Sequence, residues 1–273
     1  MHNRSYSPRT HWPRWGVALA CTLLLVAACA PQPLAVTREP ANLRLVAAGS
    51  CAPLAEALAT AYEEIRPWVT VHVEVYNNAL AKETLTNRDA DVAFLSWLGE
   101  GSGDALWSSP VASDDLAVIV HPASPLTEAS LALLQEIYRG RVQEWEGLVL
   151  AVVSREDGSG TRAAFDNTVL QGRDITLTAV VMPSSAAVVD YVARTPGSIG
   201  YVSALRLGDT ASDGVRILPI DGAMPSPGMA GDGQYPLSRG IHLATVGEPA
   251  GEAREFAQWA LGPEGQQVIE AAR

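Results

Sequence analysis

The feature that most constrains the fold is the alternation of strand-like and helix-like segments over residues 42–273. Residues 69–75 alternate valine with polar side chains, which is the period of a strand with one buried face. Residues 116–120 are continuously apolar, as in a strand that is buried on both faces. Between such segments, apolar side chains recur at helical spacing, for example in residues 54–65. Strands that alternate with helices predict an α/β protein with mostly parallel sheets.

This alternation runs through the chain twice, and the second series begins after His121-Pro122. Two series predict two lobes, one of residues 42–120 with 203–273 and one of residues 121–202, with crossings near residues 120 and 202. The glycine-containing stretches 99–103 and 222–236 are expected to be loops. The expected strands are residues 43–47, 69–75, 91–96, 116–120, 148–154, 175–181, 198–202, 215–220 and 241–246, and the expected helices are residues 54–65, 130–139, 161–170, 185–194, 252–261 and 263–272.

The first 28 residues are typical of an export signal. Arg4, Arg9 and Arg14 precede an apolar stretch, residues 16–28, and no acidic residue lies among them. As a helix, this apolar stretch spans about 20 Å, which is too short for a bilayer core of roughly 30 Å. We therefore expect a signal peptide over residues 1–28, and an extracytoplasmic mature protein.

The end of this signal resembles the bacterial lipobox. In Val26-Ala27-Ala28-Cys29, cleavage before Cys29 would leave a thiol that is diacylated, for example with palmitate. More than one acyl chain makes a stable membrane anchor. Three prolines follow within residues 29–41, which we expect to form an extended tether. Cleavage at Cys21 would interrupt the apolar stretch, and secretion without lipid is the other alternative.

The composition argues against disulfides, nucleic-acid binding and metal sites. Once Cys21 is removed and Cys29 is acylated, Cys51 is alone, so the mature chain has no intrachain disulfide. The net charge is −11, with 30 acidic against 19 basic residues, which disfavours nonspecific nucleic-acid binding. The histidines at 72, 121 and 242 are isolated, and no calcium-loop pattern is present. We expect no metal and no cofactor.

The segment richest in chemistry is Val152–Phe165, in which a buried strand leads through Ser154-Arg155-Glu156-Asp157-Gly158-Ser159-Gly160-Thr161 into a helix. The glycines let the backbone approach a ligand closely. The first N–H groups of a helix lack internal partners and lie at the positive end of its dipole. Hydroxyls and an arginine fork add donors suited to an oxyanion. The segment therefore predicts an anion-binding loop.

The same loop fits two familiar catalytic or nucleotide motifs poorly. It lacks the lysine of a P-loop, and Asp157 occupies the first glycine position of a Gly-x-Ser-x-Gly elbow. An ordinary helix cap beside a surface arginine is the plain structural alternative. An exported serine hydrolase that uses Ser159 with His121 or His242 remains the alternative from another functional class.

Several stretches together resemble the phosphate-binding proteins of bacterial high-affinity phosphate ABC transporters. They are SREDGSGTR at 154–162, residues 119–145 with VHPASPL and IYRGRVQEW, RTPGSIGYV at 194–202, YPLSR at 235–239 and GPEGQQVI at 262–269. The resemblance implies a type II, two-lobed periplasmic binding protein fold, with mixed sheets, flanking helices and a two-strand hinge. It also implies a monomer without enzymatic activity that closes around one oxyanion and delivers it to a membrane permease.

The resemblance also assigns residues in the second lobe. Arg155, Ser159, Gly160 and Thr161 match the anion contacts of the family. Asp157 matches an acid that holds the arginine in place.

In the first lobe, Ser50 matches a small hydroxyl residue at the first helix start, and Ser96 matches a serine at a strand end. The family often has a glycine- and serine-rich turn after its second strand. Here that turn contains Asn77 and Asn78, and we expect Asn78 to serve as the ligand contact.

One departure bears on specificity. The best-known members have an aspartate after the serine of the third strand, and this chain has Trp97 there. That aspartate accepts the proton of hydrogen phosphate and repels sulfate. Asp157, Asp114 or a backbone carbonyl could substitute. Phosphate is the expected ligand, and sulfate, molybdate or tungstate on the same fold is the alternative.

Overall fold

The computed structural model of the chain describes residues 38–99, 106–207, 214–226 and 235–272. The expected signal peptide, Cys29 and most of the tether lie outside the described residues, as do most of the two expected glycine-containing loops. Pro40–Arg273 forms one compact unit. No helix in the described ranges is both long and apolar enough to span a membrane.

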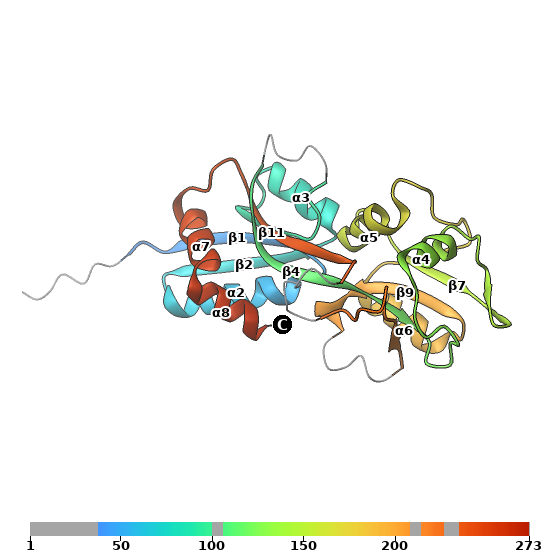
Figure 1. Cartoon of the computed structure of the whole chain (residues 1–273). Helices are drawn as coiled ribbons and strands as arrows, with labels where there is room; N and C mark the ends of the chain where they lie inside the picture. Colours follow the sequence, from blue (N-terminus) through green and yellow to red (C-terminus); the bar gives the residue numbers. More distant parts are fainter. Residues whose placement is uncertain (1–37, 100–105, 208–213, 227–234, 273) are drawn as a thin grey trace, which may run out of the picture. The chain divides into compact units, whose positions relative to one another are not determined.

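The strands and helices follow one another as the sequence pattern predicts, with a few differences (Figure 1). The strands are β1 (Ala41–Ala48), β2 (Val69–Tyr76), β3 (Val92–Leu95), β4 (Leu106–Val120), β5 (Glu144–Trp145), β6 (Leu148–Val149), β7 (Ala151–Arg155), β8 (Val180–Met182), β9 (Ser198–Ser203), β10 (Arg216–Ile217) and β11 (Ser238–Val246). The helices are α2 (Ala52–Ile65), α3 (Asn78–Thr86), α4 (Leu131–Tyr138), α5 (Gly160–Phe165), α6 (Ser185–Arg194), α7 (Gly251–Leu261) and α8 (Pro263–Ala271), with a π-helical turn η3 (Asp166–Leu170) and a 3-10 turn η4 (Ala204–Arg206).

Within the described ranges, nine strands form one mixed sheet in the order β2-β1-β3-β11-β4-β9-β7-β8, with β10 paired to β4. The strands around β1 and around β7 are parallel. Strand β11 is antiparallel to both β3 and β4, and β4 is antiparallel to β9. The expected mixed sheet with flanking helices is confirmed, whereas the expectation of mostly parallel pairing holds only at the two ends of the sheet.

The buried apolar side chains of the described residues form four clusters, and the two largest define the lobes. Leu45, Leu58 and Phe256 belong to a cluster between β1, α2 and the C-terminal helices. Phe165 and Tyr201 stack with ring centroids 3.9 Å apart in a second cluster around β9 and α5. We call the described residues around these clusters the first lobe, residues 40–99, 106–115 and 238–272, and the second lobe, residues 116–207, 214–226 and 235–237, of which Leu205 packs against the first cluster.

Strand β4 runs through both lobes. Its residues 106–115 pair with β11, and its residues 116–120 pair with β9. The side chains of Leu116, Val118 and Leu237 pack in the second cluster. From this packing we propose crossings between residues 115 and 116 and between residues 237 and 238; the crossings predicted near residues 120 and 202 stay a prediction.

The parallel strands bring several helix starts to the same edge of the sheet. In the first lobe, α2 follows β1 and α3 follows β2. In the second lobe, α5 follows β7 and α6 follows β8. The carboxyl ends of parallel strands are the usual place for a ligand in an open α/β sheet.

Candidate functional site

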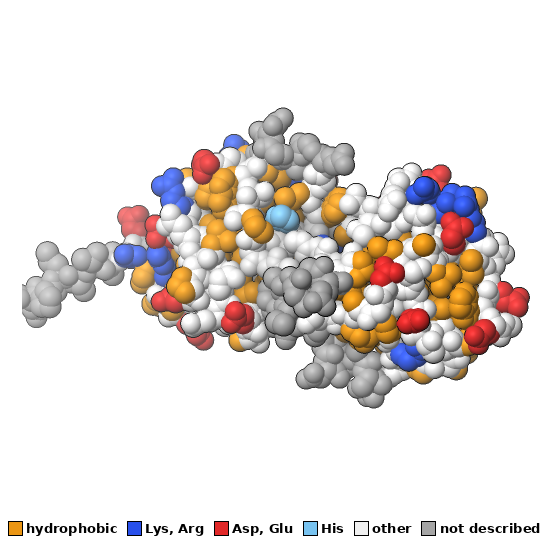
Figure 2. Space-filling model, viewed as in Figure 1, with side chains coloured by type: hydrophobic (Ala, Val, Ile, Leu, Met, Phe, Trp, Pro, Cys, Tyr) orange, Lys and Arg blue, Asp and Glu red, His pale blue; other side chains and the backbone are white. Residues whose placement is uncertain are grey.

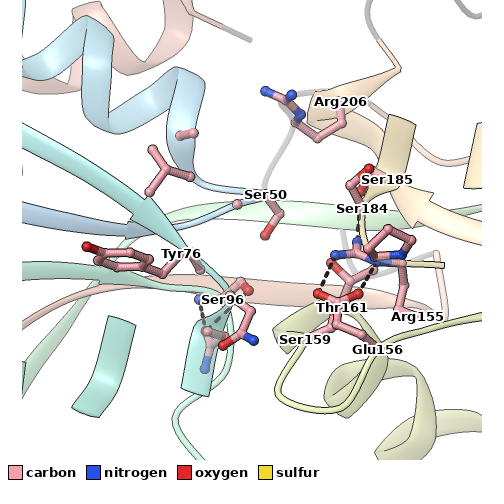
Figure 3. A pocket seen from close by; sticks show the side chains of 18 of the residues that line it. Ser50, Tyr76, Ser96, Arg155, Glu156, Ser159, Thr161, Ser184, Ser185 and Arg206 are labelled. Carbon is pink, nitrogen blue, oxygen red and sulfur yellow. Dashed lines mark hydrogen bonds and ion pairs between the residues drawn. The ribbon is translucent and has the colours of Figure 1, made fainter. Parts of the chain in front are cut away.

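A pocket of about 800 Å³ lies between the two lobes. The first lobe lines it with the segments that begin α2 and α3 and with Ser96, which follows β3. The second lobe lines it with Arg155 and Glu156, with the start of α5 and with the start of α6. Figure 3 shows Ser50 and Ser96 facing Arg155 and Thr161 across this pocket.

Four helix starts converge on the pocket. Local sequence fixes three of them through a polar side chain that accepts from the first turn: Asn77 from Leu80 N–H at 2.9 Å, Ser159 from Arg162 N–H at 3.3 Å, and Ser184. The fourth, α2, has a proline in its first turn, where its missing N–H costs nothing. Because every helix start carries free N–H groups and partial positive charge, this edge of the pocket favours an anion.

Arg155 is the buried cation of the site. Its side chain is 9% exposed, and its guanidinium binds both oxygens of Glu156, with Nε at 2.8 Å and Nη2 at 3.0 Å. Its Nη1 donates to the Ser185 hydroxyl at 3.0 Å. These bonds hold the fork in one orientation at the pocket wall, which is the arrangement that suits bidentate recognition of an oxyanion.

Asn78 supports the first-lobe wall from within. Its side-chain oxygen accepts from Ser96 N–H at 2.9 Å and from Trp97 N–H at 3.1 Å, and its Nδ2 donates to the Trp97 carbonyl at 2.8 Å. These bonds fix the end of β3, and with it the Ser96 hydroxyl, against the start of α3.

Cys51 is inert under the first-lobe wall. Its side chain is fully buried, with the Ser50 hydroxyl 3.9 Å from its sulfur. Burial raises the pKa of the Cys51 thiol to about 12. The thiol therefore stays protonated and serves as a small core side chain.

The two lobes touch at the edge of the pocket. The Ala79 N–H donates to the Gly158 carbonyl at 3.0 Å. A Cβ built on Gly160 would lie 2.3 Å from the Ser96 hydroxyl and 2.8 Å from the Asn78 side-chain oxygen. Only glycine at 160 allows this approach of the backbones.

All seven residues expected to contact a ligand line this one pocket: Ser50, Asn78, Ser96, Arg155, Ser159, Gly160 and Thr161. The expectation that Asp157 holds Arg155 is wrong. The Asp157 side chain is 94% exposed and pairs with Arg162 at 2.5 Å, whereas Glu156 occupies the position beside Arg155. Asp157 lies beyond the end of β7, in the turn that it forms with Gly158, and its carboxylate is exposed to solvent.

Some pocket residues were missed from the sequence. Ser184 and Ser185 could have been found, because they follow a strand and begin a helix, as Ser159 does. Glu156 lies within the SREDGSGTR segment, but the sequence pattern gives it no role of its own. Nothing in the sequence pattern pointed to Glu56 on α2 or to Arg206 in η4, which tertiary structure brings to the pocket.

The remaining candidates fall elsewhere. Trp97 does not wall this pocket but packs against the second cluster and lines two neighbouring cavities. No histidine is among the described residues that line the pocket, and no group of possible metal ligands occurs in the described part of the chain. On the face drawn in Figure 2, basic side chains lie in small groups beside acidic ones, rather than forming the continuous basic surface of a nucleic-acid-binding protein.

A family model described as a PBP superfamily domain matches residues 35–264. The chain belongs to the PBP superfamily. This family match spans both lobes and every helix start that faces the pocket.

Relatives of this PBP superfamily member include the phosphate-binding protein PstS of Bacillus subtilis (strain 168), which is 29% identical over 242 residues, covering 85% of this chain and 79% of that protein. A protein assigned as a phosphate ABC transporter substrate-binding protein from Clostridium perfringens, solved with bound phosphate, superposes with a TM-score of 0.75 at 24% identity, covering 85% of this chain and 97% of that one. An ABC-type phosphate transport receptor from Vibrio cholerae superposes with a TM-score of 0.72 at 24% identity, and the match covers 84% of this chain and 98% of that one. These structures establish the two-lobed type II fold.

Proposed function

We propose that this chain is an extracytoplasmic receptor that captures inorganic phosphate and delivers it to the permease of an ABC transporter. The observation that carries the proposal is the convergence of four helix starts and the buried Arg155 on one pocket. Such a site supplies many N–H and O–H donors and a fixed positive charge, which is the chemistry that a small oxyanion requires.

The ligand would be held by donors from both lobes. In the second lobe these are the N–H groups of Gly160 and Thr161, the Ser159 hydroxyl and the Arg155 guanidinium. In the first lobe they are the hydroxyls of Ser50 and Ser96. Because each lobe supplies only part of the set, ligand stabilises the state in which the lobes are closest. Asn78 would act through its backbone N–H and by fixing Ser96, since its side chain is already bonded.

Phosphate is favoured among the oxyanions by the relatives, which include a PstS protein and receptors of phosphate ABC transporters. One observation favours the alternative of sulfate, molybdate or tungstate, namely Trp97 at the position where an aspartate is expected. The phosphate hypothesis requires that the pocket offers an acceptor for the proton of the ligand, and the hypothesis of a fully ionised oxyanion does not.

We further propose that Cys29 carries the lipid that anchors the protein at the membrane, and that the protein acts as a monomer without catalysis. A hydrolase mechanism gains nothing from the geometry, because the Ser159 hydroxyl caps α5 and the described pocket lining contains no histidine. Cys29→Ala should abolish incorporation of labelled palmitate and release the protein from membranes. Unchanged membrane retention would refute the anchor.

Calorimetric titration of the purified protein with phosphate, sulfate, molybdate and tungstate tests the function. We expect one phosphate per chain, bound much more tightly than the other three anions. Tight binding of another anion with weak phosphate binding would support the alternative, and heat-silent titrations with all four would refute an oxyanion receptor.

A further inference from the structure

A pocket that selects phosphate needs a hydrogen-bond acceptor, and this requirement rests on the function proposed above. At neutral pH phosphate keeps at least one proton, whereas sulfate has none. A carboxylate in the pocket therefore gains a hydrogen bond from hydrogen phosphate but meets only like charge in sulfate. Trp97 cannot supply that carboxylate, so the acceptor is either a backbone carbonyl or a carboxylate from another residue of this chain, and only a carboxylate adds repulsion of sulfate.

The two aspartates considered from the sequence do not reach the pocket. Asp114 is buried in an ion pair with Arg239, with Nη2 of the arginine 2.7 Å from its carboxylate. Asp157 points to solvent and pairs with Arg162. Neither aspartate lines the pocket.

Two carboxylates remain among the described residues that line the pocket, Glu56 and Glu156. Glu56 lies on the second turn of α2 and is exposed, so water competes for its oxygens. Glu156 is 24% exposed and is drawn in Figure 3 beside Arg155, Ser159 and Thr161, which are among the donors that the ligand would use. Glu156 is therefore the lining carboxylate that lies beside the proposed donors of a bound oxyanion.

Its pairing with Arg155 leaves Glu156 able to accept another bond. An ionised carboxylate offers about four lone-pair sites, and the Arg155 fork occupies one on each oxygen. The same fork fixes the direction of the carboxylate, as a selective acceptor requires. The other charged side chains of the described lining, Arg206 and Glu56, come from η4 and α2.

We propose that the Glu156 carboxylate accepts the proton of bound hydrogen phosphate and so makes the pocket reject sulfate. Arg155 and Glu156 then act as one unit, in which the guanidinium donates to the ligand and the carboxylate accepts from it.

The test is the ratio of phosphate to sulfate affinity in Glu156→Gln, measured by calorimetry beside the wild-type protein. We expect phosphate affinity to fall by about 10- to 100-fold, while sulfate affinity stays constant or rises. Asp157→Asn, which neutralises the neighbouring exposed acid outside the pocket, is the matched control and should leave the ratio unchanged, and Glu56→Gln tests the other carboxylate of the pocket as the competing acceptor. Thermal melts confirm that each variant is folded, and Glu156→Asp serves as a second variant whose shorter side chain should also lower the ratio.

The outcomes separate this inference from the proposed function. If Glu156 only positions Arg155, both anions weaken by the same factor and the ratio stays constant, which overturns the inference while phosphate binding by the wild-type protein stands. A ratio that changes in Glu56→Gln but not in Glu156→Gln overturns it as well. A wild-type protein that binds neither anion, or that prefers sulfate, refutes the proposed phosphate receptor and the inference together.

Discussion

The contact between Gly160 and the first lobe carries a prediction that separates ligand affinity from folding stability. In Gly160→Ala, the new Cβ would lie 2.3 Å from the Ser96 hydroxyl and 2.8 Å from the Asn78 side-chain oxygen. The hydroxyl can rotate away. The Asn78 oxygen cannot, because the N–H groups of Ser96 and Trp97 hold it at 2.9 and 3.1 Å. The starts of α3 and α5 must therefore separate by a few tenths of an ångström or more.

Because the two helix starts are pushed apart, a ligand that must contact both lobes binds more weakly. Overpacking of this kind costs about 1–3 kcal/mol, which corresponds to a loss of about 5- to 150-fold in phosphate affinity. Without ligand the lobes can relax apart, and alanine is a better helix residue than glycine by up to about 1 kcal/mol. The unliganded variant should therefore unfold at nearly the wild-type temperature.

Titration calorimetry and scanning calorimetry on the same samples make the measurement. Gly222→Ala is the matched control, because Gly222 has φ +79° with no atom within 4 Å of an added Cβ, and it lies outside the pocket. Backbone strain of about 1–2 kcal/mol should lower the unfolding temperature of this control and leave its phosphate affinity unchanged. Wild-type affinity in Gly160→Ala would refute the idea that this contact belongs to the liganded state.

Three further predictions follow from buried or charged side chains. Arg155→Ala should weaken phosphate binding by about 10²- to 10⁴-fold, because two charge-assisted hydrogen bonds are lost, while calorimetric melts still show a folded protein. Unchanged phosphate affinity would contradict the assignment of the site. Because burial raises the pKa of Cys51 to about 12, a thiol reagent at about pH 8 should label it only after denaturant is added, and rapid labelling of the native protein would contradict its burial. Burial lowers the pKa of His242, whose Nδ1 is buried with no hydrogen-bond partner among the described residues. Because the unfolded chain then binds a proton more readily than the folded one, the free energy of unfolding should fall as the pH drops below about 6.5 and through the folded-state pKa. His242→Gln should flatten this fall in melts, and an identical slope would contradict the assignment.

Much of the fold could be predicted because local patterns and tertiary structure agree. Residues 185–194 match α6 at both ends, since Ser184 caps the helix and Pro196 follows its end. Residues 54–65 fall within α2 and share its last residue, because the apolar side chains at helical spacing do point into one cluster.

The misses have physical causes. Helix α3 was not expected because Asn77 and Asn78 resemble a turn, and a cap and a turn use the same side chains. The first ten residues of β4 contain Pro110 and alternate irregularly, so only pairing with β11 defines them as a strand. Residues 175–181 have strand-like composition, yet only Val180–Met182 pair with β7. The positions of the crossings have no local signal in the sequence, because β4 continues without a break from one lobe to the other.

The residues of the site likewise divide into those that have a local signal in the sequence and those that tertiary structure alone brings to the pocket. Residues at helix starts, such as Ser159 and Ser50, could be predicted because their positions follow from a strand that ends and a helix that begins. The partner of Arg155 could not, since Glu156 and Asp157 are both acidic neighbours and only the direction of the turn at Gly158 decides between them. Arg206 reaches the pocket from a segment far away in the sequence.

The most direct test of the account is a crystal structure of the protein grown with phosphate. We predict a single tetrahedral anion bound by Arg155, Thr161 and the start of α5 on one side and by Ser50 and Ser96 on the other, with one of its oxygens within hydrogen-bond distance of Glu156. An empty pocket at saturating phosphate, or an anion bound by one lobe alone, would contradict it.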